Sequence, residues 1–290
     1  MAGVNATQET ANATLTRILV VGDAQPIAEI WGKFHNDPKW RTDFVCHWQD
    51  AAPMLRHARY AVVLVHLGME SASELTVMRT LRATNQHVKI ILFVEQSTID
   101  QLLAAIRAHA FSYFSYPFDV SAACHMINTA AALSDWVNGI EVLSATPEYL
   151  TLRLRCAMST ADRLVQFMKE VPIELLPDEL HDTAQAFREL LLNAIEHGGK
   201  LDRNQWVRVS RVRTKRTLVY HIVDPGEGFS RWDLSHAAVS HSDDPLFHVQ
   251  IREALGYRAG GFGMLIARHM VDEVIYNEQG NQVILIKHVD

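Results

Sequence analysis

Three short segments in the second half of the chain carry residue types that could bind a phosphate compound. In the first segment, Glu189, Asn193 and Glu196 follow one another at positions i, i+4 and i+7 among mostly apolar residues. On a helix this spacing places the three polar side chains on one face. We expect that face to meet either water or a binding site.

The second segment places a carboxylate beside glycines. Asp224 follows the apolar run 218 to 223, and Gly226 and Gly228 come directly after it. A carboxylate there can accept a hydrogen bond from an exocyclic amine, and glycines let the backbone approach a planar ligand where a Cβ would clash. Taken alone, the same residues are also typical of an ordinary turn.

The third segment is rich in glycine and precedes a predicted helix. Gly260, Gly261 and Gly263 stand directly before a helical pattern that runs from 263 to 274. A glycine-rich helix start offers free N–H groups and a favourable dipole to phosphate oxygens. This segment therefore could seat a triphosphate, although on its own it could equally be a flexible loop.

The elements around these segments indicate an α+β two-layer sandwich in residues 139–290. Alternating apolar and polar residues predict strands, and longer amphipathic stretches predict helices. The predicted strands are 140–143, 149–154, 206–212, 217–223 and 282–288, and the predicted helices are 160–171, 177–197 and 263–274. Helices that cluster apart from an antiparallel sheet are typical of this class.

Residues 17–138 predict a different, doubly wound α/β domain. Apolar runs at 17–23, 61–65 and 88–94 alternate with helical stretches at 24–35, 71–84 and 97–109, and a long amphipathic helix at 120–137 closes the domain. Near-continuous apolar strands indicate a parallel sheet that is covered on both faces. Residues 1–16 lack apolar periodicity, and we expect a disordered tail there.

The order and spacing of the three glycine and carboxylate segments resemble the N, G1 and G2 boxes of the Bergerat-fold ATPases, the superfamily of gyrase and histidine kinases. Within that superfamily, the run Glu-x-x-x-Asn-Ala-x-x-His-Gly and the closing run 271 to 276 look most like the anti-sigma-factor serine kinases. The resemblance covers about residues 140–290. It implies a Bergerat ATP-binding fold for this half of the chain.

This resemblance assigns roles to individual residues. Asn193 would coordinate Mg²⁺, Asp224 would hold the adenine amine, and Glu189 would be the general base for phosphoryl transfer. The glycines would shape the ATP pocket at its adenine and phosphate ends; they are Gly226, Gly228, Gly261 and Gly263. Residues 229–260 would form the lid over ATP.

Two positions depart from the serine-kinase pattern. Phe262 stands where these kinases commonly have Arg, and Asn281 follows Gly280 where they commonly have Thr. Loss of a cation near the phosphates would weaken transition-state stabilisation. The lid segment also contains His236, His241, Asp243, Asp244 and His248. Their spacing matches no established metal-ligand pattern, so a solvated lid is the better interpretation.

The first domain resembles the receiver domain of response regulators over about residues 17–138. Asp23 stands at the position of an acidic Mg²⁺ ligand, but His66 fills the position of the acceptor aspartate. Val94 and Tyr116 replace the Thr or Ser and the Lys of that family. Aspartyl phosphorylation needs a carboxylate nucleophile, a metal and a cation. We therefore expect a pseudo-receiver kept for protein contacts, with exposed apolar surface on helix 120–137, including Trp136, for a homodimer.

Composition limits the classes of partner. The 290 residues include 27 Lys and Arg against 33 Asp and Glu, with no basic run, which disfavours nucleic acid and a polybasic membrane anchor. Three unpaired cysteines, the lack of a long apolar stretch and the lack of a targeting segment indicate a cytoplasmic protein.

Three functions remain open at this point. The first is a serine/threonine kinase that phosphorylates an anti-anti-sigma-type partner with Mg-ATP, in a pathway that regulates a sigma factor. The second is a non-catalytic switch in which nucleotide binding changes partner affinity. The third is a scaffold with a vestigial nucleotide pocket.

Overall fold

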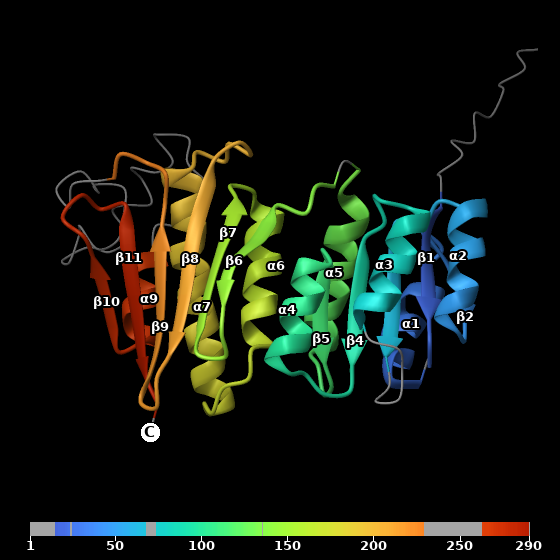
Figure 1. Cartoon of the computed structure of the whole chain (residues 1–290), viewed down its shortest axis with the longest axis horizontal. Coiled ribbons are helices and arrows are strands. Elements are labelled where there is room, and N and C mark those ends of the chain that lie inside the picture. Colours follow the sequence, from blue (N-terminus) through green and yellow to red (C-terminus); the bar gives the residue numbers. More distant parts are fainter. Residues whose placement is uncertain (1–14, 24, 68–73, 135, 229–262, 290) are drawn as a thin grey trace, which may run out of the picture.

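The chain forms two β-sheets that lie side by side along the long axis of the molecule (Figure 1). The computed structural model describes residues 15–23, 25–67, 74–134, 136–228 and 263–289. Each sheet has its own helices, and the two halves meet through helix α6 (Met158–Lys169) of the second half and strand β5 (Ser112–Ser115) of the first.

The first sheet has five parallel strands in the order β2-β1-β3-β4-β5. They are β1 (Thr16–Val21), β2 (Trp40–Val45), β3 (Val62–Leu67), β4 (Ile90–Val94) and β5 (Ser112–Ser115). Every residue of β3 and β4 is buried, as the continuous apolar runs predict for strands that are covered on both faces. The strand order places β5 at one edge of this sheet and β2 at the other.

Helices cover both faces of the parallel sheet, which confirms the doubly wound α/β prediction. One face packs against α1 (Ala28–His35) and α5 (Val120–Ala132), and a short 3₁₀ turn, η1 (Gln25–Ile27), precedes α1. The other face packs against α2 (Trp48–His57), α3 (Glu74–Thr84) and α4 (Ile99–Arg107). The Asp119 carboxylate caps α5, and Thr98 and Gln101 form a capping box at the start of α4.

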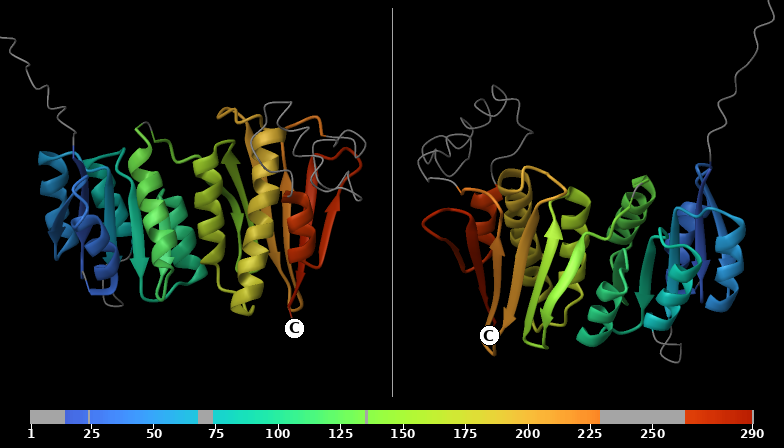
Figure 2. Two further views of the ribbon diagram at one scale, coloured as in Figure 1. Left: turned by 180° about the vertical axis from the view of Figure 1, so that it is seen from behind. Right: turned by 45° about the horizontal axis from the view of Figure 1, so that its top comes forward.

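The second sheet has six antiparallel strands in the order β10-β11-β9-β8-β7-β6. They are β6 (Ile140–Ala145), β7 (Tyr149–Arg155), β8 (Trp206–Arg213), β9 (Thr217–Val223), β10 (Glu273–Tyr276) and β11 (Gln282–His288). Helices α6 (Met158–Lys169), α7 (Pro177–Asn193) and α9 (Gly263–Met270) lie on one face of this sheet (Figure 2). The two-layer α+β prediction is confirmed.

Two predicted helices are too long. The helix predicted over 263–274 ends at Met270, because Glu273–Tyr276 pairs with β11 as strand β10. The helix predicted over 120–137 ends at Ala132. The prediction that Trp136 is exposed is wrong: the residue is 8 % exposed, and the guanidinium groups of Arg82 and Arg163 lie 4.9 Å and 5.4 Å from the centre of its ring.

The described residues also include three elements of the first domain that the apolar pattern did not indicate. They are the edge strand β2, the helix α2 and the four-residue strand β5. At the N-terminus, Thr16 already pairs with Trp40 in the sheet, so the predicted tail of residues 1–16 is one residue too long at this end. The rest of that tail, up to residue 14, lies outside the described residues.

Candidate functional site

Helix α7 carries two of the predicted site residues. Its apolar face buries Phe187, Leu190 and Leu191 beneath the antiparallel sheet. Glu189 and Asn193 lie one turn apart and remain partly exposed, as expected for a polar stripe on an apolar helix. The sequence therefore positions this carboxylate and this amide on one accessible face of α7.

The helix then changes from α to π geometry. Residues Ala194–Gly198 form a π turn, closed by a 2.8 Å hydrogen bond from the Gly199 amide to the Ala194 carbonyl. A π turn is wider than an α turn and often occurs at functional sites. The spacing that placed Glu196 on the stripe with Glu189 therefore holds only as far as Asn193. Glu196 lies beyond this change of geometry, so its place on the polar face of α7 stays a prediction.

The π turn brings the helix end against Asp224, which follows β9. A Cβ on Gly198 would overlap the Asp224 carboxylate, and a Cβ on Gly226 would lie 2.9 Å from its Oδ1 atom. The Gly226 amide donates a 2.8 Å hydrogen bond to that same oxygen. Burial raises the pKa of Asp224, and this hydrogen bond opposes the rise. A half-buried carboxylate is thus held between two glycines from separate segments.

The loop after Asp224 is fixed by the turn between β10 and β11. Gly228 has a φ of 87°, a left-handed conformation, and a Cβ there would overlap the Gln279 carbonyl. The Asn281 side chain donates to the Gly226 carbonyl at 3.3 Å, and the Asn281 carbonyl accepts from the Asp224 amide at 3.0 Å. Asn281, which departs from the serine-kinase pattern, therefore supports the Asp224 loop directly.

Helix α9 begins beside the polar stripe of α7. A Cβ on Gly263 would lie 2.9 Å from the Glu189 Oε2 atom and 3.7 Å from the Asn193 amide nitrogen. Gly263 thus has both α7 side chains as neighbours, which brings the first and third predicted segments together. Gly261, Phe262 and the predicted lid 229–260 lie outside the described residues.

Neighbouring side chains orient the Glu189 carboxylate. Gln185 donates a 3.3 Å hydrogen bond to Glu189 Oε1, and the guanidinium of Arg188 lies 3.7 Å from the same oxygen. Arg188 is itself held by Asp162 of α6, which accepts from its Nε at 3.2 Å and from its Nη2 at 3.0 Å. The carboxylate is 20 % exposed, so it can be reached from solvent.

Two further residues belong to this region, although the sequence predicted a role in the site for neither of them. Burial raises the pKa of the Tyr276 phenol to about 12, and the neighbouring Asp224 charge adds to the rise. Cys156 lies beneath Gly199, where a Cβ would overlap its sulfur. Neither residue could easily be predicted from the sequence, because Tyr276 lies next to a predicted helix and Cys156 is far along the chain from the motifs.

Two family models match this chain, one in each half. Residues 144–287 match the model described as "Histidine kinase-like ATPase domain", and residues 18–128 match the model described as "Response regulator receiver domain". The chain is a receiver domain followed by a histidine kinase-like ATPase domain. The three segments discussed above all belong to the ATPase domain.

Solved receiver domains are similar in structure to the N-terminal domain. The receiver domain of NtrC4 from Aquifex aeolicus has 17% sequence identity and a TM-score of 0.34, and the match covers 40% of this chain and 96% of that chain. The receiver domain of response regulator 1452 from Francisella has 18% identity and a TM-score of 0.36, with 40% and 96% covered. The comparison with curated proteins found no match.

The receiver domain has altered chemistry at the place where its fold binds ligands. The strand order reverses between β1 and β3, and Asp23 and His66 lie at the carboxyl ends of these two strands. His66 is only 7 % exposed, and burial lowers its pKa, whereas the charges of Asp23 and Glu95 raise it. The position at the end of β3 where receiver domains have the acceptor aspartate therefore holds a buried imidazole.

The described residues contain no group of three or more His, Cys, Asp or Glu side chains arranged to hold a metal ion. Within the same part of the chain, no helix is both long and apolar enough to cross a membrane.

Proposed function

We propose that this chain is a regulatory serine/threonine protein kinase of the bacterial cytoplasm, which uses Mg-ATP to phosphorylate an anti-anti-sigma-type protein partner. One observation carries the proposal: Glu189 and Asn193 of α7 adjoin Gly263 at the start of α9, while the end of the same helix packs against Asp224. All three predicted segments therefore contribute to one region of the ATPase domain.

The residues fit a nucleotide in their chemistry. Asp224 would accept a hydrogen bond from the adenine amine, and Gly226 and Gly228 would leave room for the ring. Asn193 would supply a side-chain oxygen to Mg²⁺, a hard cation that prefers such ligands. Gly261 and Gly263 would face the phosphates at the start of α9. ATP supplies the transferable phosphoryl group.

Glu189 would act as the general base. Its carboxylate is accessible and is oriented by Gln185 and Arg188, so it could take the proton of a serine or threonine hydroxyl.

A second candidate is a nucleotide-dependent switch without turnover, which would bind the anti-anti-sigma-type partner or the sigma factor itself. Phe262 favours it, because an apolar ring stands where an arginine commonly supports the phosphates. Binding would then act only through different affinities of the two nucleotide states for the partner.

Nucleotide binding is tested by titrating a fluorescent ATP analogue with Mg²⁺ against the wild type and Asp224→Asn. We expect Asp224→Asn to bind about tenfold more weakly or worse, because the amine would lose a charged acceptor. Asp178→Asn, an exposed aspartate at the start of α7, is the matched control and should bind like the wild type. Equal weak binding by all three proteins would refute both nucleotide proposals.

Turnover is tested separately with labelled ATP and candidate anti-anti-sigma-type proteins. Glu189→Ala should keep ATP binding and lose phosphotransfer by about a hundredfold or more. The exposed Glu174→Ala should keep both. A wild-type protein that binds ATP and transfers nothing would leave the switch as the function.

A further inference from the structure

Helix α6 of the ATPase domain lies along the open edge of the receiver sheet. Strand β5 ends that sheet, so within the described part of the chain one side of its backbone has no neighbouring strand. An uncovered strand edge exposes unpaired N–H and C=O groups. In this chain, side chains of α6 bind those groups.

Three side chains of α6 and its C-cap follow β5 in order. The Arg163 guanidinium donates to the Phe111 carbonyl at 2.7 Å and to the Ala110 carbonyl at 3.0 Å. The Gln166 amide donates to the Tyr113 carbonyl at 3.2 Å. The Glu170 carboxylate accepts from the Ser115 amide at 2.9 Å and from the Ser115 hydroxyl at 2.6 Å.

The spacing of these residues explains how a helix can follow a strand. Positions 163, 166 and 170 are i, i+3 and i+7, which share one face of a helix. Their partners at 111, 113 and 115 alternate along the strand, as backbone groups on one side of a strand do. Side chains of α6 thus take the place that backbone groups of a sixth strand would occupy.

This polar contact is buried. Arg163 is 1 % exposed, with its guanidinium 4.8 Å from the centre of the Phe111 ring and 5.4 Å from that of Trp136. It also donates to the side-chain oxygen of Asn138 in the connection between the domains, at 2.8 Å. Its described partners are carbonyl oxygens, and burial lowers its pKa to about 9. Removing the arginine would leave several buried carbonyls without a donor.

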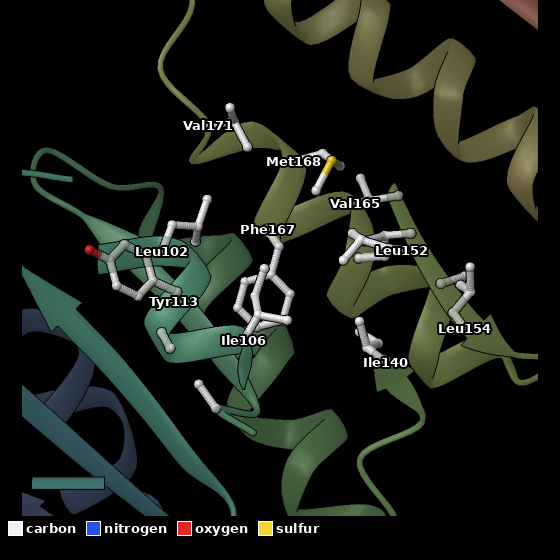
Figure 3. Close-up of a cluster of buried hydrophobic side chains, with 14 of the residues drawn as sticks. Leu102, Ile106, Tyr113, Ile140, Leu152, Leu154, Val165, Phe167, Met168 and Val171 are labelled. Carbon is white, nitrogen blue, oxygen red and sulfur yellow. The ribbon is translucent and has the colours of Figure 1, made fainter. Parts of the chain in front are cut away.

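An apolar core continues through the same contact. Leu102 and Ile106 of α4 and Tyr113 of β5 belong to the same buried cluster as Phe167 and Val171 of the ATPase domain (Figure 3). These residues belong to one continuous buried cluster that reaches from the receiver helices to the strands of the ATPase domain. An apolar core that is continuous across a contact is typical of permanent interfaces rather than of mobile domains.

Helix α6 also leads to the candidate site. Asp162 precedes Arg163 and holds Arg188 of α7 through two hydrogen bonds, and Arg188 lies 3.7 Å from the Glu189 carboxylate. A short chain of contacts therefore leads from the receiver edge to Glu189: Asp162, next to Arg163, binds Arg188, which lies near the Glu189 carboxylate.

We infer that α6 is a shared element of both domains and that, through it, the β5 edge of the receiver sets the position of α7. The receiver domain then acts on the ATPase domain through a fixed contact. A consequence for catalysis at Glu189 rests on the proposed function, but the coupling itself does not.

Hydrogen exchange of the full-length chain without nucleotide tests the coupling. Arg163→Met keeps an apolar stem and removes the donors. We expect exchange to become about tenfold faster or more in two separate segments, residues 110–116 of the receiver edge and residues 185–193 of α7. The distant strand β11 should exchange as in the wild type. Lys169→Met, an exposed position on the same helix, should change none of these segments.

Faster exchange confined to β5 and α6, or no change at all, would overturn the inference. If Arg163→Met speeds exchange throughout the chain, Gln166→Leu is used instead, because it removes a single donor to β5. The exchange rates of the same two segments in Gln166→Leu then decide the question. No arm of this experiment uses ATP or a substrate, so a chain without kinase activity would still give a clear answer.

Discussion

The Asp224 carboxylate lies so close to the backbone of Gly198 that no side chain fits between them. Gly198 ends the π turn after α7, and Asp224 follows β9, so the two residues join the helix layer to the sheet. Their contact fixes the place of the carboxylate in the ATPase domain.

Gly198→Ala should therefore destabilise the chain by about 1–3 kcal/mol, because an added methyl group must displace the carboxylate or the helix end. Urea unfolding followed by circular dichroism measures the loss. Gly32→Ala is the matched control: Gly32 lies inside α1 with no heavy atom within 4 Å of an added Cβ. The control should be neutral or more stable by up to about 1 kcal/mol. Equal stability of the two variants would show that the structure around Gly198 accommodates a methyl group without a loss in the free energy of unfolding.

The stability of the chain should depend on pH through Asp224. Burial raises the pKa of this carboxyl in the folded chain above its ordinary value of 3.8. Between 3.8 and the raised pKa, the folded state binds more protons than the unfolded state, so stability falls as the pH rises through this interval.

Asp224→Asn removes that cost, so its melting temperature should equal that of the wild type below the interval and exceed it above. Melting curves of both proteins over a pH series give the difference. A difference that stays constant with pH would contradict the raised pKa. Together with weaker nucleotide binding, a more stable Asp224→Asn would mean that the ionised carboxylate is kept for binding rather than for folding.

The receiver domain should not form an acyl phosphate. The nucleophilic carboxylate is replaced by His66, which is buried, and Tyr116 stands in place of the lysine. Incubation with acetyl phosphate and Mg²⁺, followed by intact-mass measurement, should show no added phosphate. Mass addition that is lost in the His66→Ala variant would instead identify the imidazole as an acceptor.

The three cysteines should differ in reactivity. Cys46 is exposed, whereas burial raises the pKa of the Cys156 thiol to about 11 and also raises that of Cys124. Alkylation with iodoacetamide and peptide mapping should label Cys46 first, Cys124 more slowly, and Cys156 only after unfolding. Rapid labelling of Cys156 in the native protein would mean that the contact with Gly199 opens readily.

Sequence patterns predicted the buried parts of the fold best. Strands β3 and β4 are covered on both faces, and their uninterrupted apolar residues leave little alternative. Strand β2 was missed because it is an edge strand with Arg41 and Asp43 among its residues, and β5 because it has only four residues. The strand β10 was partly assigned to a helix, because its pairing with β11 is a tertiary contact that no local pattern contains.

Those parts of the candidate site that lie within a single sequence segment could be predicted. The spacing of Glu189 and Asn193 and the glycines around Asp224 were visible in the sequence. The π turn was not visible, because it lies against Asp224, a tertiary neighbour that no local pattern contains. The burial of Trp136 was also missed, since its ring contacts two arginines from different domains, Arg82 and Arg163, which is a tertiary arrangement.

The coverage of β5 by α6 has a consequence during synthesis on the ribosome. Gln166 follows its partner Tyr113 by 53 residues. At roughly 5–20 residues per second, the growing polypeptide exposes this strand for about 3–10 seconds before its cover is made. During that time the β5 edge of the nascent receiver can pair with another nascent chain. The speed of translation between β5 and α6 therefore affects the yield of correctly folded protein.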